Sequence, residues 1–268
     1  MTITRSKIAQ RLTRAALAIA SMLLASQVLA DDTPQLAVHV EGTGTPTIVL
    51  VSGLGDTLDA WAGVQSGMSA SCATTFAYTR AGYEGSAPAS GSRDAATIVG
   101  ELRAELQQRR IPPPYVLVGH SLGGLYAQYF ARQFPSEVRG LLLIDSTHWN
   151  QQLPTALGAP STYGRPGTFL YMPFIMRREL ADSAQAGEQV HGSPPAGDIP
   201  TIVLSRTRPL NSDAANSETL AAVLQQEIAA DFPGATHVNV ANSGHYIQRD
   251  QPAVVINAAR QLAGCAPR

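Results

Sequence analysis

The stretch that most constrains the fold of this 268-residue chain is residues 115–124, Tyr-Val-Leu-Val-Gly-His-Ser-Leu-Gly-Gly. Its first four residues are bulky and apolar, which is typical of a buried strand. After Ser121, apolar residues recur at the spacing of one helix face, and the helix is expected to end near Phe134-Pro135. The stretch therefore predicts a strand, a sharp turn with Ser121 at its apex, and a helix.

Glycines lie two positions on either side of Ser121, at Gly119 and Gly123. A serine held in a strained turn needs neighbours without Cβ atoms, because strand and helix approach closely there. The alternative is a glycine-rich connection that contains a serine by chance, but the flanking strand and helix favour a nucleophile elbow. In this setting the sequence Gly-His-Ser-Leu-Gly-Gly resembles the α/β-hydrolase superfamily, and within it the esterase and lipase-like serine hydrolases. His120 matches a position that shapes the elbow in that family.

The rest of the chain alternates strand-like and helix-like segments. Strands are predicted at 36–40, 47–51, 75–78, 115–118, 138–145, 199–204 and 236–240, and helices at about 57–68, 98–110, 122–134 and 218–230 and from Pro252 onward. This alternation predicts an α/β fold with a mostly parallel central sheet and helices on both faces. Because no repeat or linker divides the chain, residues 31–268 are expected to form one domain.

Residues 1–30 are interpreted as a signal peptide. Four basic residues precede an apolar run of eleven at 15–25, and Val28-Leu29-Ala30 offers a cleavage site of small residues. A transmembrane anchor is the alternative, but the run is shorter than the ~20 residues that span a bilayer. We therefore expect a secreted or periplasmic protein, cleaved after about Ala30, with no stable membrane anchor.

Charge and motifs exclude several function classes. The chain has 19 Lys and Arg and 20 Asp and Glu, and the signal peptide would remove four of the basic residues. The mature chain would be mildly acidic, with no basic patch suited to nucleic acid. No H-E-x-x-H, C-x-x-C, G-x-G-x-x-G or P-loop pattern occurs, so we expect no metal and no cofactor. The oligomeric state stays open.

A serine nucleophile needs a base and an acid that orients the base. His245 is the predicted base because it follows the last strand, and because the order Ser, Asp, His along the chain is that of the resembled fold. Most of the superfamily places the acid after the strand that matches 199–204, where this chain has no acid before Asp213. Some members place it one strand earlier, at Asp145, which directly ends a buried strand. Asp145 is preferred, and Asp213 stays as the alternative.

The glycine-rich segment Ser52-Gly53-Leu54-Gly55 follows the strand at 47–51. Many superfamily members have His-Gly here, so Ser52 is a departure. By matching position, the resemblance implies an oxyanion hole formed by the backbone amides of Leu54 and Leu122. An ordinary strand-to-helix turn would also suit these glycines. Residues 79–86 resemble the family's Asp-Arg-x-Gly-x-Gly-x-Ser loop, and their Arg80 is expected to tie neighbouring loops together.

Residues 146–198 interrupt the alternation of strands and helices. They are rich in Pro, Gly, Gln and Ser and contain an apolar patch at 169–176. A segment of this length in a compact domain is usually a lid or binding loop. We expect a small, partly helical cap over the active site, between the sixth and seventh strands of the resembled fold. A tolerated insertion would explain its length but not its bulky apolar residues.

Cys72 and Cys265 are the only two cysteines. An exported protein can form a disulfide, and two buried free thiols are the alternative. In the resembled fold the closing helix lies beside the helix that precedes Cys72, which favours a bridge remote from the active site.

These observations predict a serine hydrolase that cleaves carboxylic esters through an acyl-enzyme. The apolar residues of the cap suggest a small-molecule ester with a hydrophobic group. An acyltransferase, a thioesterase, a peptidase or a cofactor-free perhydrolase would use the same triad. A non-catalytic binding protein on this scaffold is the rival from another class, since a fold does not imply a function. Such proteins usually lose the serine or the histidine, and both are present here.

Overall fold

The computed structural model describes residues 34–70, 72–151, 172–209 and 215–266. The predicted signal peptide, residues 1–30, lies outside them. Seven strands form one sheet in the order β1-β3-β2-β4-β5-β6-β7, in which β1 is antiparallel to β3 and the other neighbours are parallel. The strands are β1 (Val38–Glu41), β2 (Thr47–Val51), β3 (Thr74–Tyr78), β4 (Tyr115–His120), β5 (Val138–Ile144), β6 (Thr201–Arg206) and β7 (Thr236–Val240).

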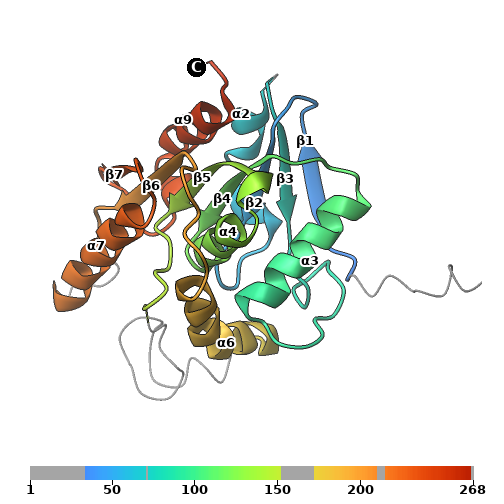
Figure 1. Cartoon of the computed structure of the whole chain (residues 1–268), viewed down its shortest axis with the longest axis horizontal. Coiled ribbons are helices and arrows are strands. Elements are labelled where there is room, and N and C mark those ends of the chain that lie inside the picture. The colour runs from blue at the N-terminus through green and yellow to red at the C-terminus, as the bar shows by residue number, and fades with distance from the viewer. Residues whose placement is uncertain (1–33, 71, 152–171, 210–214, 267–268) are drawn as a thin grey trace, which may run out of the picture. The chain divides into compact units, whose positions relative to one another are not determined.

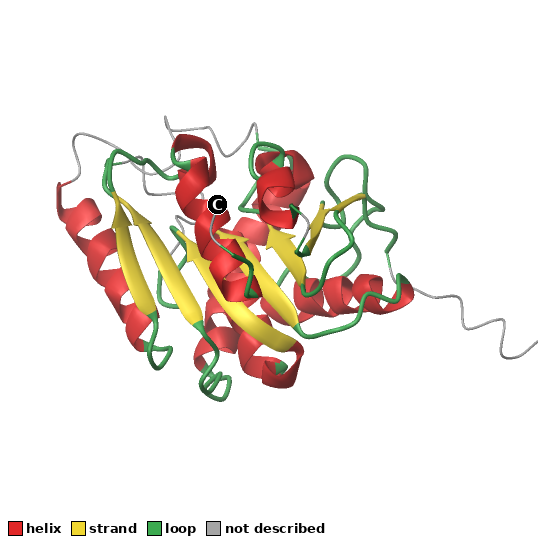
Figure 2. Cartoon of the chain, turned by 90° about the horizontal axis from the view of Figure 1, so that it is seen from above, coloured by secondary structure: helices red, strands yellow, loops and turns green. Residues whose placement is uncertain are grey.

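Helices cover both faces of this sheet (Figures 1 and 2). The longer ones are α3 (Ala95–Gln108), α4 (Leu122–Gln133), α6 (Phe174–His191), α7 (Ala215–Ala230) and α9 (Pro252–Ala263). The shorter ones are η1 (Leu58–Trp61), α2 (Gln65–Ser69), η2 (Pro135–Glu137) and α8 (Ile247–Asp250). Helices α3, α4 and α6 pack against one another, and α2 packs against α9.

The central strands are buried on both faces, which explains their continuous apolar sequences. Successive residues of β4 point to opposite sides: Leu117 joins the core that contains α3 and α4, whereas Val116 and Val118 join the core that contains α2 and α9. The same alternation holds in β2 and β5. The predicted fold class is therefore confirmed.

Two helices differ from the sequence prediction. The helix predicted at about 57–68 is split into η1 and α2, and the side chain of Thr57 caps η1 by accepting a hydrogen bond from the Asp59 amide. In α7, Leu220, Leu224 and Ile228 follow one another at a spacing of four, as on one helix face. Leu224 and Ile228 are buried, but Leu220 is 56% exposed, so the core does not extend to Leu220.

The predicted cap segment, 146–198, lies between β5 and β6 of the seven described strands. Its described part is helical over α6, whose residues Leu180, Ala186 and Val190 are buried in the core beside α3 and α4. The residues 152–171 lie outside the described part of the chain.

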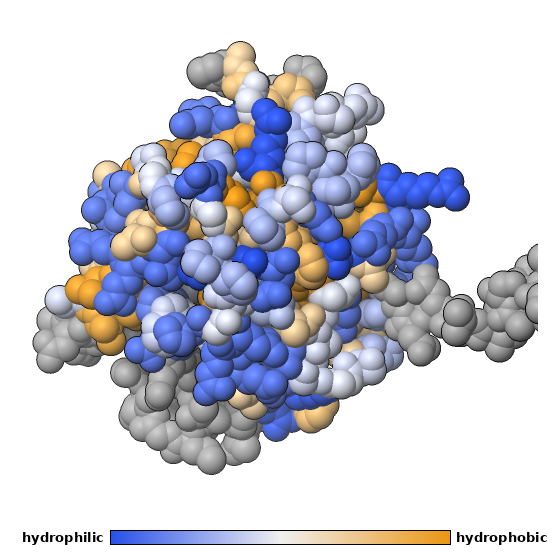
Figure 3. Space-filling view, in the orientation of Figure 1, coloured by the Kyte–Doolittle hydropathy of each residue, from blue (hydrophilic) through white to orange (hydrophobic). Residues whose placement is uncertain are grey.

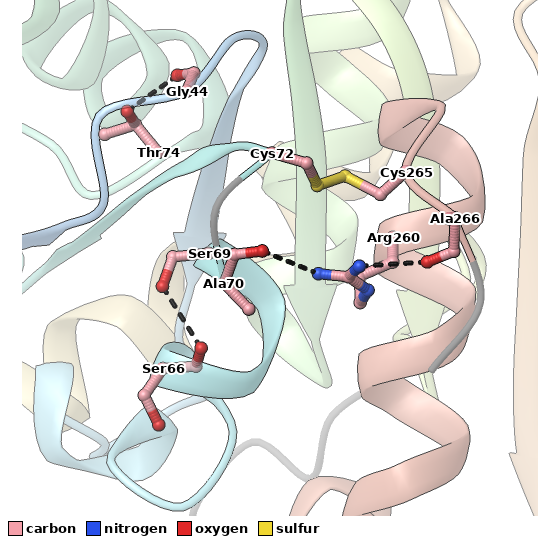
Figure 4. The surroundings of a disulfide bond; sticks show 9 residues. All are labelled: Gly44, Ser66, Ser69, Ala70, Cys72, Thr74, Arg260, Cys265 and Ala266. Carbon is pink, nitrogen blue, oxygen red and sulfur yellow. Dashed lines mark hydrogen bonds between the residues drawn. A yellow bond between two sulfur atoms is a disulfide. The ribbon is translucent and has the colours of Figure 1, made fainter.

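A disulfide joins Cys72, just before β3, to Cys265, just after α9 (Figure 4). Arg260 of α9 donates hydrogen bonds to the carbonyls of Ala70 and Ala266 on either side of it. Both cysteines lie at the amino-terminal edge of the parallel strands, which is the edge opposite to Ser121.

No helix in the described segments is long and apolar enough to cross a membrane. Figure 3 shows apolar residues interspersed with polar ones over one face of the molecule. The most exposed large apolar side chain among the described residues is Phe174, at the start of α6, with 67% exposed.

Candidate active site

Ser121 lies in the turn between β4 and α4, with φ 52° and ψ −125°. A non-glycine residue in this region is strained, and the strain projects the side chain out of the turn. The glycines around it leave no room for a side chain: a Cβ on Gly119 would lie 2.6 Å from Gly124 Cα, and one on Gly123 would overlap the carbonyl of Val51. The predicted strand, sharp turn and helix are therefore the observed local geometry.

The backbone of Ser121 is fixed to the neighbouring strand β5. Its amide donates to the Ile144 carbonyl at 3.0 Å, and its carbonyl accepts from the Thr147 amide at 3.0 Å. These bonds join the elbow to the loop that begins at Asp145. The Gln128 side chain of α4 holds the same loop by donating to the Thr147 carbonyl. The position of Ser121 relative to Asp145 is thus set by main-chain contacts.

Asp145 and His245 are brought together although they are 100 residues apart. His245 Nδ1 lies 2.5 Å from Asp145 Oδ2, at the carboxyl ends of β5 and β7. Asp145 has φ 40°, so its backbone is strained as well. The side chain of Asp145 is 2% exposed and that of His245 is 25% exposed. A buried carboxylate on Nδ1 orients the imidazole and leaves Nε2 for chemistry.

Arg206, the last residue of β6, also binds Asp145. Its Nη1 donates to Asp145 Oδ2 at 2.6 Å, so one oxygen serves both Arg206 and His245. Burial by itself raises the pKa of Asp145, but the hydrogen bond and charge of His245 and the charge of Arg206 outweigh it and lower that pKa below its ordinary value. Asp145 is therefore ionised at neutral pH.

His120 supports His245 from the other side. The two imidazole rings lie 4.6 Å apart between centroids, and His120 Nε2 donates to the His245 carbonyl at 3.0 Å. His120 Nδ1 lies 3.6 Å from Asp56 Oδ2. Burial lowers the pKa of His120 despite the opposing effect of Asp56. A neutral His120 can hold His245 without adding a second positive charge beside it.

Ser121 Oγ and His245 are not joined by a hydrogen bond within the described chain. They are linked through His120, which is adjacent to Ser121 in sequence and whose ring contacts that of His245 at an angle of 49°. Catalytic hydrogen bonds are often long in proteins without substrate and tighten only in the complex. The side chain of Ser121 is mostly buried, with 7% of the residue exposed.

The two predicted oxyanion donors flank the elbow. Leu122 is the first residue of α4, and Leu54 follows Gly53, where a Cβ would lie 3.2 Å from Ser121 Cβ. Within the described chain neither the Leu54 amide nor the Leu122 amide donates a hydrogen bond to another protein group. Two free amides beside a serine hydroxyl can receive a developing negative charge.

The alternative acid, Asp213, lies outside the described residues. Sequence reasoning missed Arg206, because its place beside Asp145 depends on β5 and β6 being parallel neighbours. It also missed the contact between His120 and Asp56. Within the described segments, no group of three or more His, Cys, Asp or Glu side chains is placed to hold a metal ion.

The chain is similar to known proteins in sequence and in fold. A model described as "Alpha/beta hydrolase family" matches residues 48–258. The uncharacterised protein YbdG of Bacillus subtilis is 32% identical over 116 residues, which cover 42% of this chain and 35% of that protein. The chain thus matches about a third of that relative's length. The uncharacterised protein YqjL of the same organism is 26% identical over 219 residues, which cover 81% of this chain and 83% of that one.

Two solved structures share the fold. A hydrolase from Pseudomonas aeruginosa superposes with a TM-score of 0.62 at 18% identity, covering 89% of this chain and 97% of that one. A thermophilic esterase from Thermogutta terrifontis superposes with a TM-score of 0.60 at 20% identity, covering 84% and 92%. At these identities the likeness concerns the fold alone.

Proposed function

The chain belongs to the alpha/beta hydrolase family, and from that premise we propose that it cleaves carboxylic esters through an acyl-enzyme formed on Ser121. The observation that carries the proposal is the hydrogen bond of 2.5 Å between His245 and Asp145 beside a strained serine turn. A structural histidine at a strand end has no need of a buried carboxylate 100 residues away. The esterase from Thermogutta terrifontis among the similar structures is consistent with ester substrates.

In the first half of the proposed reaction, Ser121 Oγ attacks the ester carbonyl carbon and His245 accepts the hydroxyl proton. Asp145 keeps the imidazole in the required tautomer and stabilises the imidazolium. The tetrahedral intermediate then collapses: the bond to the leaving oxygen breaks, and His245 returns the proton to the departing alcohol. The product that stays behind is an ester between Ser121 and the acyl group.

In the second half, His245 removes a proton from water, and the water oxygen attacks the acyl carbon. The bond between that carbon and Ser121 Oγ then breaks, His245 returns the proton to Ser121, and a carboxylic acid leaves. The Leu54 and Leu122 amides would hold the oxyanion in both halves. Each such donor is typically worth about 3 kcal/mol of transition-state stabilisation. Free amides at these two positions support that role.

We further propose that the protein is exported and that its substrate carries a hydrophobic group. The pattern of residues 1–30 and the disulfide between Cys72 and Cys265 support export. For the substrate, the support is Met172 and Phe174, apolar residues at the start of α6 that stay partly or largely exposed. Residues 146–198 would form the cap over the site.

The test is hydrolysis of a series of p-nitrophenyl esters by the mature chain, together with matched thioesters and anilides. Wild-type protein should hydrolyse esters with saturation kinetics. Replacement of Ser121 by alanine should lower kcat by at least about 10³-fold, the range seen when a triad member is removed. If Ser121→Ala keeps the wild-type rate, Ser121 is not the nucleophile. Faster turnover of thioesters or anilides would show that the substrate is a thioester or an amide and not an ester.

A further inference from the structure

The most deeply buried ion pair in the described chain joins Arg80 to Glu179. Their side chains are 1% and 0% exposed, and Arg80 Nε and Nη2 donate to the two carboxylate oxygens at 2.7 Å each. Arg80 follows β3, whereas Glu179 lies on α6, in the predicted cap segment. A buried ion pair adds little net stability over an apolar pair of the same shape. Its presence here therefore calls for a role other than stability.

The remaining donors of Arg80 hold the loop after β2. Nη1 donates to the Ser52 carbonyl at 2.5 Å, and Nη2 donates to the Gly53 carbonyl at 2.8 Å. Hydrogen bonds from a charged donor are about twice as strong as neutral ones. The carbonyl of Gly53 and the amide of Leu54 belong to one trans peptide unit and point in opposite directions. By fixing the Gly53 carbonyl, Arg80 therefore aims the Leu54 amide away from itself.

Tyr83 fixes the other side of Leu54. Its hydroxyl donates to Glu179 Oε2 at 2.7 Å and accepts from the Gly55 amide at 3.2 Å. The peptide units before and after Leu54 are thus both held by side chains that meet on the same carboxylate. A rotation of the Leu54 amide would break charged hydrogen bonds inside the protein, where water cannot replace them.

Helix α6 also packs directly on these loops. A Cβ on Gly55 would lie 2.6 Å from Met176 Cε, and a Cβ on Gly82 would lie 2.6 Å from Ile175 Cδ1. Two consecutive residues of α6 therefore fill the space that side chains at Gly55 and Gly82 would occupy. The carboxylate of Glu179 can keep its position only while α6 stays packed against the loops that contain Gly55 and Gly82.

We propose that Arg80 and Glu179 are positioning residues for the oxyanion hole, and that they make the orientation of the Leu54 amide depend on the seating of α6. The proposal rests on the proposed function, in which Leu54 is an oxyanion donor. Neither side chain touches the reacting atoms: Arg80 acts through the Gly53–Leu54 peptide, and Glu179 acts through Arg80 and Tyr83.

The test replaces the ion pair by an apolar pair, Arg80→Met with Glu179→Leu. Both charges leave together, so the unfolding midpoint should fall less than in either single variant, which would leave one buried charge without its partner. The Ser52 carbonyl loses its charged donor, and the Gly53 carbonyl keeps only the Asp56 amide at 3.3 Å. We therefore expect kcat to fall by about 10- to 100-fold, at most the loss of one whole oxyanion donor. KM should change by less than about threefold, because the amide acts on the transition state. Affinity for a trifluoromethyl ketone, whose serine adduct carries an oxyanion, should fall in parallel with kcat.

The matched control is the pair Arg93 and Glu101, which is also bidentate and largely buried, with side chains 0% and 11% exposed. The side chain of Arg93 makes no hydrogen bond to the loop after β2 among the described residues. Arg93→Met with Glu101→Leu should leave kcat and ketone affinity within about twofold of the wild-type values, because its contacts do not reach the transition state.

The wild type is first treated with a fluorophosphonate that labels active-site serines. If Ser121 is not labelled, the proposed function and this inference are both wrong. If wild type is labelled and the folded apolar pair keeps kcat and ketone affinity within twofold, the positioning role is wrong. If the apolar pair does not fold, Tyr83→Phe decides, since it removes only one hydroxyl. A drop in kcat of severalfold at constant KM supports the proposal, and an unchanged kcat overturns it.

Discussion

Asp145 Oδ2 is the atom on which the electrostatics of the site converge. It accepts from His245 at 2.5 Å and from Arg206 at 2.6 Å. Coulomb energies between such close charges are large in a site that excludes water. The charge of Arg206 adds to the effect of His245 in lowering the pKa of Asp145. Arg206 therefore helps to keep the carboxylate ionised and able to orient His245.

Replacing Arg206 by glutamine removes the charge and keeps a hydrogen-bond donor. The acid limb of the pH profile of kcat/KM should move to higher pH, because loss of the Arg206 charge raises the pKa of Asp145. His120 and Asp56, on the other side of His245, are unchanged by the substitution. The measurement is kcat/KM for one ester from pH 4 to 9. A shift of the acid limb to lower pH would contradict this account of Arg206.

The buried His120 gives the protein a pH-dependent stability. Burial lowers its pKa in the folded state below the ordinary value of about 6.5. As pH falls through that ordinary value, the unfolded chain takes up a proton that the folded chain resists, so the free energy of unfolding falls. The loss continues until pH reaches the lower pKa of the folded state.

We therefore predict that His120→Gln, which keeps a donor for the His245 carbonyl, makes the free energy of unfolding fall less steeply between pH 7.5 and pH 5.5. One proton is at stake, so the slope should decrease by at most about 1.4 kcal/mol per pH unit. Equal slopes for wild type and His120→Gln would show that His120 is not held neutral.

At the scale of elements, the elbow depends on the close approach of β4, α4 and the loops beside them. A Cβ on Gly123 would overlap the Val51 carbonyl, which belongs to the backbone and cannot move aside cheaply. Gly123→Ala should therefore destabilise the fold by about 3 kcal/mol or more. Urea unfolding at pH 7 measures the change.

Gly100 is the matched control for Gly123. It lies inside α3, is exposed, and a Cβ there would meet no atom within 4 Å. Gly100→Ala should stabilise the protein by about 0.5–1 kcal/mol, because alanine loses less backbone entropy in a helix. A tolerated Gly123→Ala, with stability like that of Gly100→Ala, would contradict the steric account of the elbow.

The sequence predicted the elements well where one pattern decided the outcome. The strands at β2 and β4 follow from continuous apolar runs, and the α4 boundary follows from Ser121 and the proline after Phe134. The split between η1 and α2 was missed because Trp61, Val64 and Met68 are all buried, as they would also be in one continuous helix. The exposure of Leu220 could not be predicted, because the spacing of apolar residues does not show where the surface that packs against α7 ends.

The residues of the candidate site likewise fall into those that the sequence predicts and those that it does not. Ser121, Asp145 and His245 could be selected from the sequence because each follows a predicted strand, and parallel strands bring their carboxyl ends to one edge. The partners Arg206 and Glu179 could not, since each depends on which strand or helix lies beside which. That information comes from the sheet order and from the packing of α6.

At the scale of the whole molecule, the two edges of the sheet have different tasks. The candidate site lies at the carboxyl ends of the strands, and the disulfide closes the opposite edge over a separation of 193 residues. A cross-link over so long a loop restricts the unfolded chain strongly, with an expected contribution of about 3–5 kcal/mol.

The double variant Cys72→Ser with Cys265→Ser should lose that stability in chemical denaturation and keep its kcat at 25 °C. Wild-type protein treated with a reductant should behave in the same way. A folded double variant with a kcat lowered more than tenfold would show that the two edges are coupled and would contradict the separation of tasks.

The central claim is that Ser121 is a nucleophile, and covalent labelling tests it most directly. Wild-type protein, Ser121→Ala and His245→Gln are treated with a fluorophosphonate and analysed by intact mass and peptide mapping. The account predicts one adduct per wild-type chain, located on Ser121, no adduct on Ser121→Ala, and labelling of His245→Gln slowed by at least about 10²-fold through loss of the general base. An adduct on another residue, or equal labelling of wild type and Ser121→Ala, would contradict it.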